Sequence, residues 1–354
     1  MTSTLLSRRD MLKGTMALAA TTSVGVTATT RWHRAEAQES AALPRARIDG
    51  VLRQAVDAKD VPGVVVMAAT DKGLLYEGAF GTRVLDNGAA MTLDTVFRIA
   101  SMTKAVTCVA AMQLVEQGKL TLEDPVPNID PALGSPQVLE GFDVAGATRL
   151  RPAKRPITLR HLLTHTAGFS YEVWDANMVR YVKASGMPSM ASGKVVALLE
   201  TPSTPEFWPG GGGLYSTGRD YLAFLQMLLH GGSFNGAQLL RPETVALMGQ
   251  NHIGNIPAGI MKTENPARSN DVDFFPGAEV RWGLGYMLNM QPGPNGRSAG
   301  TVSWGGIFNT YYWLDPVQRV TGLIMPQLLP FADQRVLQLY GQFESAIYNA
   351  VKAA

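Results

Sequence analysis

A serine and a lysine spaced three residues apart, Ser101 and Lys104, are the residues of this 354-residue chain best suited to covalent chemistry. They open a run rich in apolar residues that stops at Gly118, which predicts a buried helix beginning at Ser101. Residues i and i+3 share one face of a helix, so the Lys104 amine can reach the Ser101 hydroxyl. An unpaired ammonium is costly to bury, and a desolvated amine can activate a neighbouring hydroxyl. The spacing therefore predicts Ser101 as a nucleophile and Lys104 as its proton partner.

A plainer interpretation of the same residues stays open. Ser101 can simply cap the helix while Lys104 extends to the surface, and a Ser-x-x-Lys match is expected by chance about once in a chain of this size. The position at a helix N-terminus favours the reactive interpretation, because backbone N–H groups there stabilise a developing negative charge. Cys108, the only cysteine, lies one turn beyond Lys104 and is expected to be a small core residue.

Strand and helix patterns at both ends of the chain predict one shared antiparallel sheet. At the N-terminal end, the pattern predicts a helix over residues 48–56 and strands over 64–68 and 73–81. At the C-terminal end, it predicts strands over 281–290, 298–303 and 311–325, the last of them broken at Asp315-Pro316. A helix is predicted to follow over 333–353. A short strand over 95–100 leads into Ser101.

The segment between these ends is rich in proline and glycine and carries short helical patterns over 159–166, 220–229 and 242–249. We interpret it as an inserted helical lobe, residues 121–276. The sheet lobe then consists of residues 38–120 together with 277–354, and the whole is an α+β protein with a sheet flanked by helices.

Residues 1–37 have the pattern of an export signal. Ser7-Arg8-Arg9-Asp10 precedes a mildly apolar run, Met16 to Val26, and Ala35-Glu36-Ala37 offers the small residues that a signal peptidase accepts. The pattern resembles a twin-arginine signal, and the run is shorter than the ~20 apolar residues of a membrane span. We expect cleavage after Ala37 and a periplasmic or secreted protein with no membrane attachment afterwards.

Composition excludes several other classes of protein. With 46% apolar residues, 17% charged residues and a net charge of +2, the chain has a globular balance and no basic stripe for nucleic acid. His161 and His165 are spaced i, i+4, but Leu162 replaces the glutamate of a zinc-protease motif, so we expect hydrogen-bonding roles for them. No metal or cofactor is expected.

Four segments carry a resemblance to a known family: Phe97 to Lys104, His161 to Gly168, Gly210 to Leu214, and Trp304-Gly305-Gly306. Together they resemble the serine hydrolases related to class C β-lactamases, and most closely their family VIII carboxylesterase branch. The resemblance spans about residues 45–350. It implies the β-lactamase/DD-peptidase-like fold, with an acyl-serine intermediate at the junction of the two lobes.

The resemblance also implies roles by position. It makes Ser101 the nucleophile and Lys104 its proton partner. It implies an oxyanion hole formed by the backbone N–H groups of Ser101 and Ile307. The implied substrate pocket also involves Trp304, Gly305, Gly306, Gly212 and Gly213. Trp304-Gly305-Gly306 stands where the lactamase branch has Lys-Thr-Gly. A lysine there binds a substrate carboxylate, which tryptophan cannot do. Our hypothesis is that the substrate is a neutral ester with an apolar acyl group.

The same resemblance implies a Tyr-x-Asn or Tyr-x-Ser motif whose tyrosine acts as general base with the serine and lysine. Tyr215-Ser216-Thr217 has the right form, but its setting after the glycine run resembles a later element of the family. In the family a long helical segment separates the block that matches His161 to Gly168 from the glycine run. Here only residues 169–209 separate the two, so the segment with the base motif is expected to be missing. Three interpretations stay open: Tyr215 has taken over, Tyr171 or Tyr181 substitutes, or the chain is an internally truncated form with impaired activity.

Taken together, these observations predict a serine hydrolase that needs no cofactor, a carboxylesterase for small neutral esters with short acyl groups. Two different functions stay open beside it: a catalytically impaired binding or cell-wall-recognition module of the same fold, and a D-amino-acid peptidase or β-lactamase.

Overall fold

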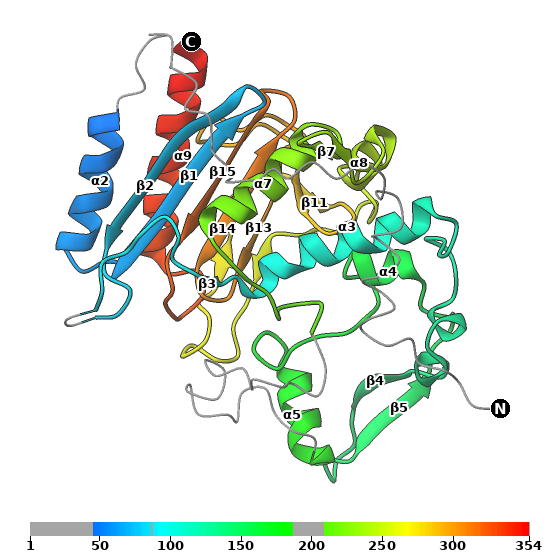
Figure 1. Cartoon of the computed structure of the whole chain (residues 1–354). Helices are drawn as coiled ribbons and strands as arrows, with labels where there is room; N and C mark the ends of the chain where they lie inside the picture. Colours follow the sequence, from blue (N-terminus) through cyan, green and yellow to red (C-terminus); the bar gives the residue numbers. More distant parts are fainter. Residues whose placement is uncertain (1–44, 86–87, 187–208, 354) are drawn as a thin grey trace, which may run out of the picture. The chain divides into compact units, whose positions relative to one another are not determined.

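Strands from the two ends of the chain form one seven-stranded antiparallel sheet (Figure 1). The computed structural model describes residues 45–85, 88–186 and 209–353, so the expected export signal lies outside the described residues. In spatial order the strands are β11 (Val280–Trp282), β12 (Met287–Asn289), β13 (Val302–Gly306), β14 (Thr310–Asp315), β15 (Val320–Met325), β1 (Gly63–Thr70) and β2 (Gly73–Gly81). Val65 of β1 lies opposite Met325 of β15, which confirms that the two ends share a sheet.

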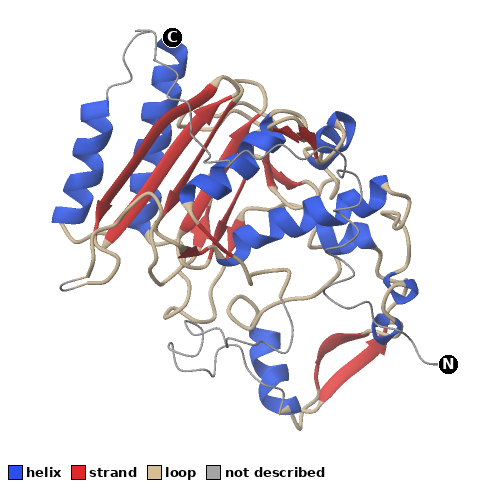
Figure 2. Cartoon of the chain, in the orientation of Figure 1, coloured by secondary structure: helices blue, strands red, loops and turns tan. Residues whose placement is uncertain are grey.

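The strand β1, next to the edge strand β2, is buried on both faces, and its side chains alternate between two cores. Val64, Val66 and Ala68 pack with α2 (Arg45–Asp57) and α9 (Gln334–Ala353). Val65, Met67 and Ala69 pack with α3 (Thr103–Glu116) and α7 (Gly218–Leu229). Figure 2 shows these helices on the two sides of the sheet. The α+β fold class is confirmed.

The structure corrects several expected elements. Residues 281–290 form two antiparallel strands, β11 and β12, rather than one, because the chain turns between Trp282 and Met287. The strand expected over 298–303 begins later and is β13. The helix at Ser101 is not buried all round: one side carries buried residues such as Val109 and Met112, while Leu114 is 39% exposed.

The described part of segment 121–276 carries hairpins as well as the expected helices. It contains the helices α4 (Leu159–Leu163), α5 (Ala176–Ser185) and α8 (Pro242–Met248), and also three hairpins: β4 (Gln137–Phe142) with β5 (Thr148–Pro152), β7 (Ser233–Phe234) with β8 (Ala237–Gln238), and β9 (Ile260–Met261) with β10 (Val272–Asp273). Asp143 builds the first hairpin turn, since its carboxylate accepts hydrogen bonds from the N–H groups of Ala145 and Ala147.

One helix of this segment belongs to the packing of the main sheet. The helix α7 lies against β1 and β15, where Leu225 is fully buried. Residues 41–354 form one compact unit by their internal contacts. Among the described residues, no helix combines the length and the apolar character needed to cross a bilayer.

Candidate active site

Ser101 lies in a sharp turn between a short strand and the long helix α3. The strand β3 (Phe97–Arg98) leads into a single 3₁₀ turn, η1 (Ala100–Met102), from which α3 continues. Ala100 has φ = +45°, a left-handed conformation that costs energy for a residue with a side chain. Strain of this kind gathers at functional sites, where the surrounding fold holds it in place.

Lys104 makes the contact that its spacing predicts. Its Nζ lies 2.8 Å from Ser101 Oγ and 2.7 Å from the carbonyl oxygen of Gly211. Burial lowers the pKa of Lys104 to about 8, because the ammonium loses hydration when it leaves water. The side chain does not extend to the surface, which rules out the plainer interpretation.

The glycine run 210–213 lies against the N-terminal part of α3. The Thr107 hydroxyl donates to the carbonyl oxygen of Gly210 at 2.7 Å, and the Leu214 N–H donates to the Thr103 hydroxyl at 3.2 Å. A Cβ at Gly211 would lie 3.5 Å from Lys104 Nζ. The run therefore supplies a backbone carbonyl directly to the buried amine.

The other expected pocket glycines occupy this same turn. The N–H groups of Gly212 and Gly213 both donate to the carbonyl oxygen of Pro209, at 3.1 and 2.9 Å. A Cβ at Gly212 would lie 3.8 Å from the carbonyl carbon of Ala100, so this glycine approaches the backbone just before Ser101. A Cβ at Gly213 would meet Pro209 instead.

The end of β13 reaches the turn that holds Ser101. A Cβ at Gly306 would collide with the carbonyl oxygen of Ile99, so only glycine permits this close approach of the two backbones. Ile307 follows at the start of the turn to β14, and its side chain packs on the core that contains α2 and α9. This arrangement brings the end of β13 next to η1.

The three candidate tyrosines lie in different places. The ring centroid of Tyr171 is 6.0 Å from Lys104 Nζ, and burial raises the pKa of its hydroxyl. Tyr215 lies on β6 (Tyr215–Ser216), opposite Arg98 of β3, and is 47% exposed. Tyr181 lines a separate cavity beside α5. The tyrosine that the structure brings next to Lys104 is therefore Tyr171.

The two histidines have separate roles. The imidazole Nδ1 of His161 lies 3.0 Å from the Thr158 N–H and completes a capping box at the start of α4, as expected of a hydrogen-bonding residue. His165 has φ = +57°, and burial together with the charge of Lys104 lowers its pKa to about 4. Within the described ranges, no cluster of three or more His, Cys, Asp or Glu residues could hold a metal ion.

A chain of aromatic contacts starts and ends beside Lys104, and we call it the aromatic chain. The ring centroids of neighbouring members lie 4.7 to 6.4 Å apart, mostly in edge-to-face or tilted geometry. Its members in order are His165, Trp282, Trp304, Phe274, Phe331, Trp174 and Tyr171. Of these, Trp304 and Tyr171 were singled out from the sequence as possible site residues, and His165 as a hydrogen-bonding residue.

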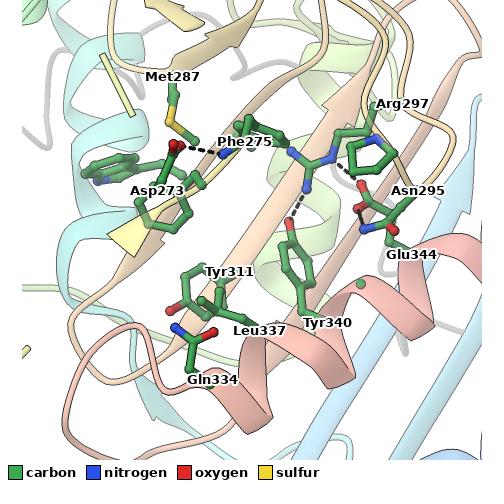
Figure 3. Close-up of a pocket in the computed structure, with 15 residues that line it drawn as sticks. Asp273, Phe275, Met287, Asn295, Arg297, Tyr311, Gln334, Leu337, Tyr340 and Glu344 are labelled. Atoms are coloured by element: carbon green, nitrogen blue, oxygen red, sulfur yellow. Dashed lines mark hydrogen bonds and ion pairs between the residues drawn. The ribbon is translucent and has the colours of Figure 1, made fainter. Parts of the chain in front are cut away.

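A nearby cavity, drawn in Figure 3, has a volume of about 220 Å³. Its lining includes Phe274 and Trp304 of the aromatic chain. Neither Ser101 nor Lys104 lines it. Its wall includes a buried ion pair between Arg297 and Glu344, and the Arg297 guanidinium also donates to the Tyr340 hydroxyl at 2.9 Å. These contacts join the loop before β13 to α9.

Comparisons of the sequence with known proteins identify a family and several relatives. The family described as Beta-lactamase matches residues 48–194 and 173–345. Monacolin J acid methylbutanoyltransferase of Aspergillus terreus is 35% identical over 188 residues, which cover 51% of this chain and 45% of the transferase. Lovastatin esterase of Penicillium rubens is 25% identical over 400 residues, which cover 86% of this chain and 99% of the esterase.

Several solved structures share the fold of this chain. The LovD6 mutant of simvastatin synthase (LovD) from Aspergillus terreus matches with a TM-score of 0.73 and 27% identity, over 89% of this chain and 97% of the synthase. EstCE1, described as a hydrolase with promiscuous acyltransferase activity, shares the fold with a TM-score of 0.59 over 86% of this chain and 98% of its own. The expected β-lactamase-type fold is confirmed.

Proposed function

The chain belongs to the Beta-lactamase family, in a group of serine hydrolases and acyltransferases, and on that premise we propose that it is an esterase that forms an acyl-enzyme on Ser101. One observation carries the proposal. A partly buried amine with a pKa of about 8 lies 2.8 Å from the hydroxyl at the start of α3.

The proposed reaction uses Lys104 in its neutral form. One N–H of the amine donates to the Gly211 carbonyl, which leaves the nitrogen lone pair to accept the Ser101 proton. The serine oxygen attacks the ester carbonyl carbon, and the proton moves to Lys104. The C–O bond to the alcohol then breaks, and Lys104 returns the proton to the departing oxygen. Water, or a second alcohol, later attacks the acyl-serine by the same route.

Backbone N–H groups of Ser101 and Ile307 are our candidates for stabilising the negative oxygen that forms during each attack. The close approach of β13 to η1 supports this assignment. In other hydrolases the loss of one such donor costs about 3–4 kcal/mol of transition-state stabilisation.

The aromatic chain supports an uncharged substrate with an apolar acyl group. The Trp304 ring packs edge-on against Trp282, with ring centroids 4.7 Å apart, and at a tilt against Phe274, with centroids 6.0 Å apart. The strand position that could carry a carboxylate-binding lysine therefore presents an apolar surface instead. The relatives named as a lovastatin esterase and a methylbutanoyltransferase act on esters and acyl groups by their names, which supports both water and alcohols as acceptors.

We also propose that the segment carrying the family's base tyrosine is missing and that the enzyme is slow for this reason. The alignment with lovastatin esterase runs over 400 residues yet includes only 86% of this 354-residue chain, so part of the esterase faces a gap. The family match falls into two parts that meet over residues 173–194. Tyr171 lies near Lys104, but its raised pKa keeps it a phenol rather than a base, which leaves Lys104 to act alone.

Export by the twin-arginine route remains part of the proposal, and a small ester is the proposed partner. No metal, cofactor, nucleic acid or membrane takes part in the proposed reaction. Fractionation of cells that make the full chain, beside a variant with Arg8 and Arg9 replaced by lysine, tests the route. Retention of the variant inside the cell supports export, and equal distribution of the two proteins contradicts it.

A burst experiment tests the esterase proposal. We expect p-nitrophenyl butyrate to release about one equivalent of p-nitrophenol quickly and the rest slowly, and Ser101→Ala to abolish the burst. Unchanged release by Ser101→Ala would contradict the esterase and favour a binding module of the same fold. Competition of the ester with a D-amino-acid peptide and with a β-lactam tests for peptidase and β-lactamase activity. Comparable turnover of either compound would overturn the preference for neutral esters.

A further inference from the structure

A larger cavity lies beside the β4–β5 hairpin, and we call it the hairpin cavity. Its volume is about 630 Å³, and it is bounded by the hairpin, residues 153–157, α5 and the loop of residues 166–170. Neither Ser101 nor Lys104 lines it. Cavities of about 300–1,000 Å³ are the size that holds small organic molecules.

Much of the lining is apolar. The side chains that give it this character are those of Leu150, Ile157, Phe169, Met178 and Tyr181. Phe169 is 63% exposed, and α5 has no buried residue within the described chain although Met178 and Tyr181 lie on one of its sides. Exposed apolar surface around a cavity is typical of a ligand site.

Positive charge gathers at the same cavity. Lys154 and Arg155 line it, are exposed, and form no ion pair with the described residues. Arg151 is already neutralised by Glu140 at 2.8 Å. Asp175, the one carboxylate among the described lining residues, accepts hydrogen bonds from the N–H groups of Asn177 and Met178 at the start of α5. The lining therefore combines a net positive charge with a large apolar surface.

We propose that the hairpin cavity binds an apolar molecule that ends in a carboxylate. The apolar body packs against Phe169, Met178 and Tyr181, and the carboxylate pairs with Lys154 and Arg155. A purely apolar ligand leaves the two cations without a partner, and a cationic ligand is repelled by them. The proposal concerns binding only, so it stands or falls independently of the acylation of Ser101.

The cavity is one loop away from the catalytic lysine. Residues 166–170 line it, and the two residues that flank this loop, His165 and Tyr171, both lie near Lys104. A bound ligand therefore contacts the segment that forms part of the surroundings of the catalytic amine.

Titration calorimetry on the full chain tests the proposal. The Ser101→Ala variant serves as the parent, and the probes are decanoate, decanol and decyltrimethylammonium, which share one alkyl chain and differ in the charge of the head group. We expect saturable binding of one decanoate, at least about tenfold tighter than decanol, and no binding of the cation. Equal affinity for decanoate and decanol, or tighter binding of the cation, overturns the proposal.

Variants at exposed positions localise the site. We expect Lys154→Glu/Arg155→Glu to weaken decanoate binding about tenfold, and Met178→Asp to weaken decanoate and decanol alike. Lys119→Glu is the matched control, because it changes an exposed lysine that does not line the cavity. Thermal melts verify that each variant is folded. Unchanged decanoate affinity in the double variant, or an equal loss in the control, contradicts the proposed site.

Discussion

Replacement of Lys104 by arginine removes the base of the proposed reaction but keeps a long cation in its place. Burial lowers the pKa of Lys104 from 10.5 to about 8. At neutral pH roughly one amine in ten is then uncharged, against roughly one in three thousand for an ordinary lysine. Arginine stays protonated throughout the working range. We therefore expect Lys104→Arg to slow the acylation of Ser101 by ~10²–10⁴-fold, the usual cost of losing a general base.

A fluorophosphonate probe forms an oxygen–phosphorus bond with Ser101 and releases fluoride, so the rate of this reaction, followed by intact-protein mass spectrometry, reports the same loss of the serine proton to Lys104 as acylation does. In the native protein the rate should rise about tenfold per pH unit below the pKa of Lys104 and level off about one unit above it, because only the neutral amine accepts the serine proton. Ser101→Ala supplies the background, and tryptophan emission verifies that the protein stays folded. A native rate that does not change across the pKa, or an arginine variant that reacts within about threefold of the native rate, would refute the role of Lys104.

Three further outcomes follow from the site and its support. Tyr171→Phe and Tyr215→Phe should each keep the acylation rate within about threefold, whereas a loss of tenfold or more in one of them would identify that tyrosine as a substitute base. Gly306→Ala should lower the free energy of unfolding by about 1–3 kcal/mol in a denaturant titration and should also slow acylation, because the new Cβ collides with the Ile99 carbonyl oxygen close to Ser101. Native-like values of both quantities would contradict the close approach of Gly306 to Ile99. Arg297→Met should lower the free energy of unfolding by about 3–5 kcal/mol, because it leaves the Glu344 carboxylate buried without its partner. The double variant Arg297→Met/Glu344→Leu should recover most of that stability. A double variant no more stable than the single one would show that the loss does not come from the broken ion pair.

Local spacing was sufficient to predict the reactive pair. Ser101 and Lys104 are three residues apart at the start of a helix, and the geometry of one helical turn fixes the distance between them. The buried strand β1 and the antiparallel strands near the C-terminus were predictable for a similar reason, because a doubly buried strand reads as a continuous apolar run.

Contacts between distant segments were beyond the reach of the sequence. The Gly211 carbonyl reaches Lys104 from 107 positions further along the chain, and nothing in a glycine run indicates which side chain its carbonyl will meet. Tyr171 and Tyr215 likewise could not be ranked, since the strand pairing between β3 and β6 holds Tyr215 opposite Arg98 while the loop after α4 carries Tyr171 to the lysine.

The sequence by itself determined the contact between Ser101 and Lys104 and the α+β class of the fold, because these depend on helical periodicity and on the pattern of apolar residues within short segments. The tertiary structure alone decided which backbone carbonyl accepts a hydrogen bond from the Lys104 amine, which aromatic rings surround this amine and how far it is removed from water. Those properties depend on packing between segments far apart in the chain, and it is this packing that lowers the pKa of Lys104 to about 8.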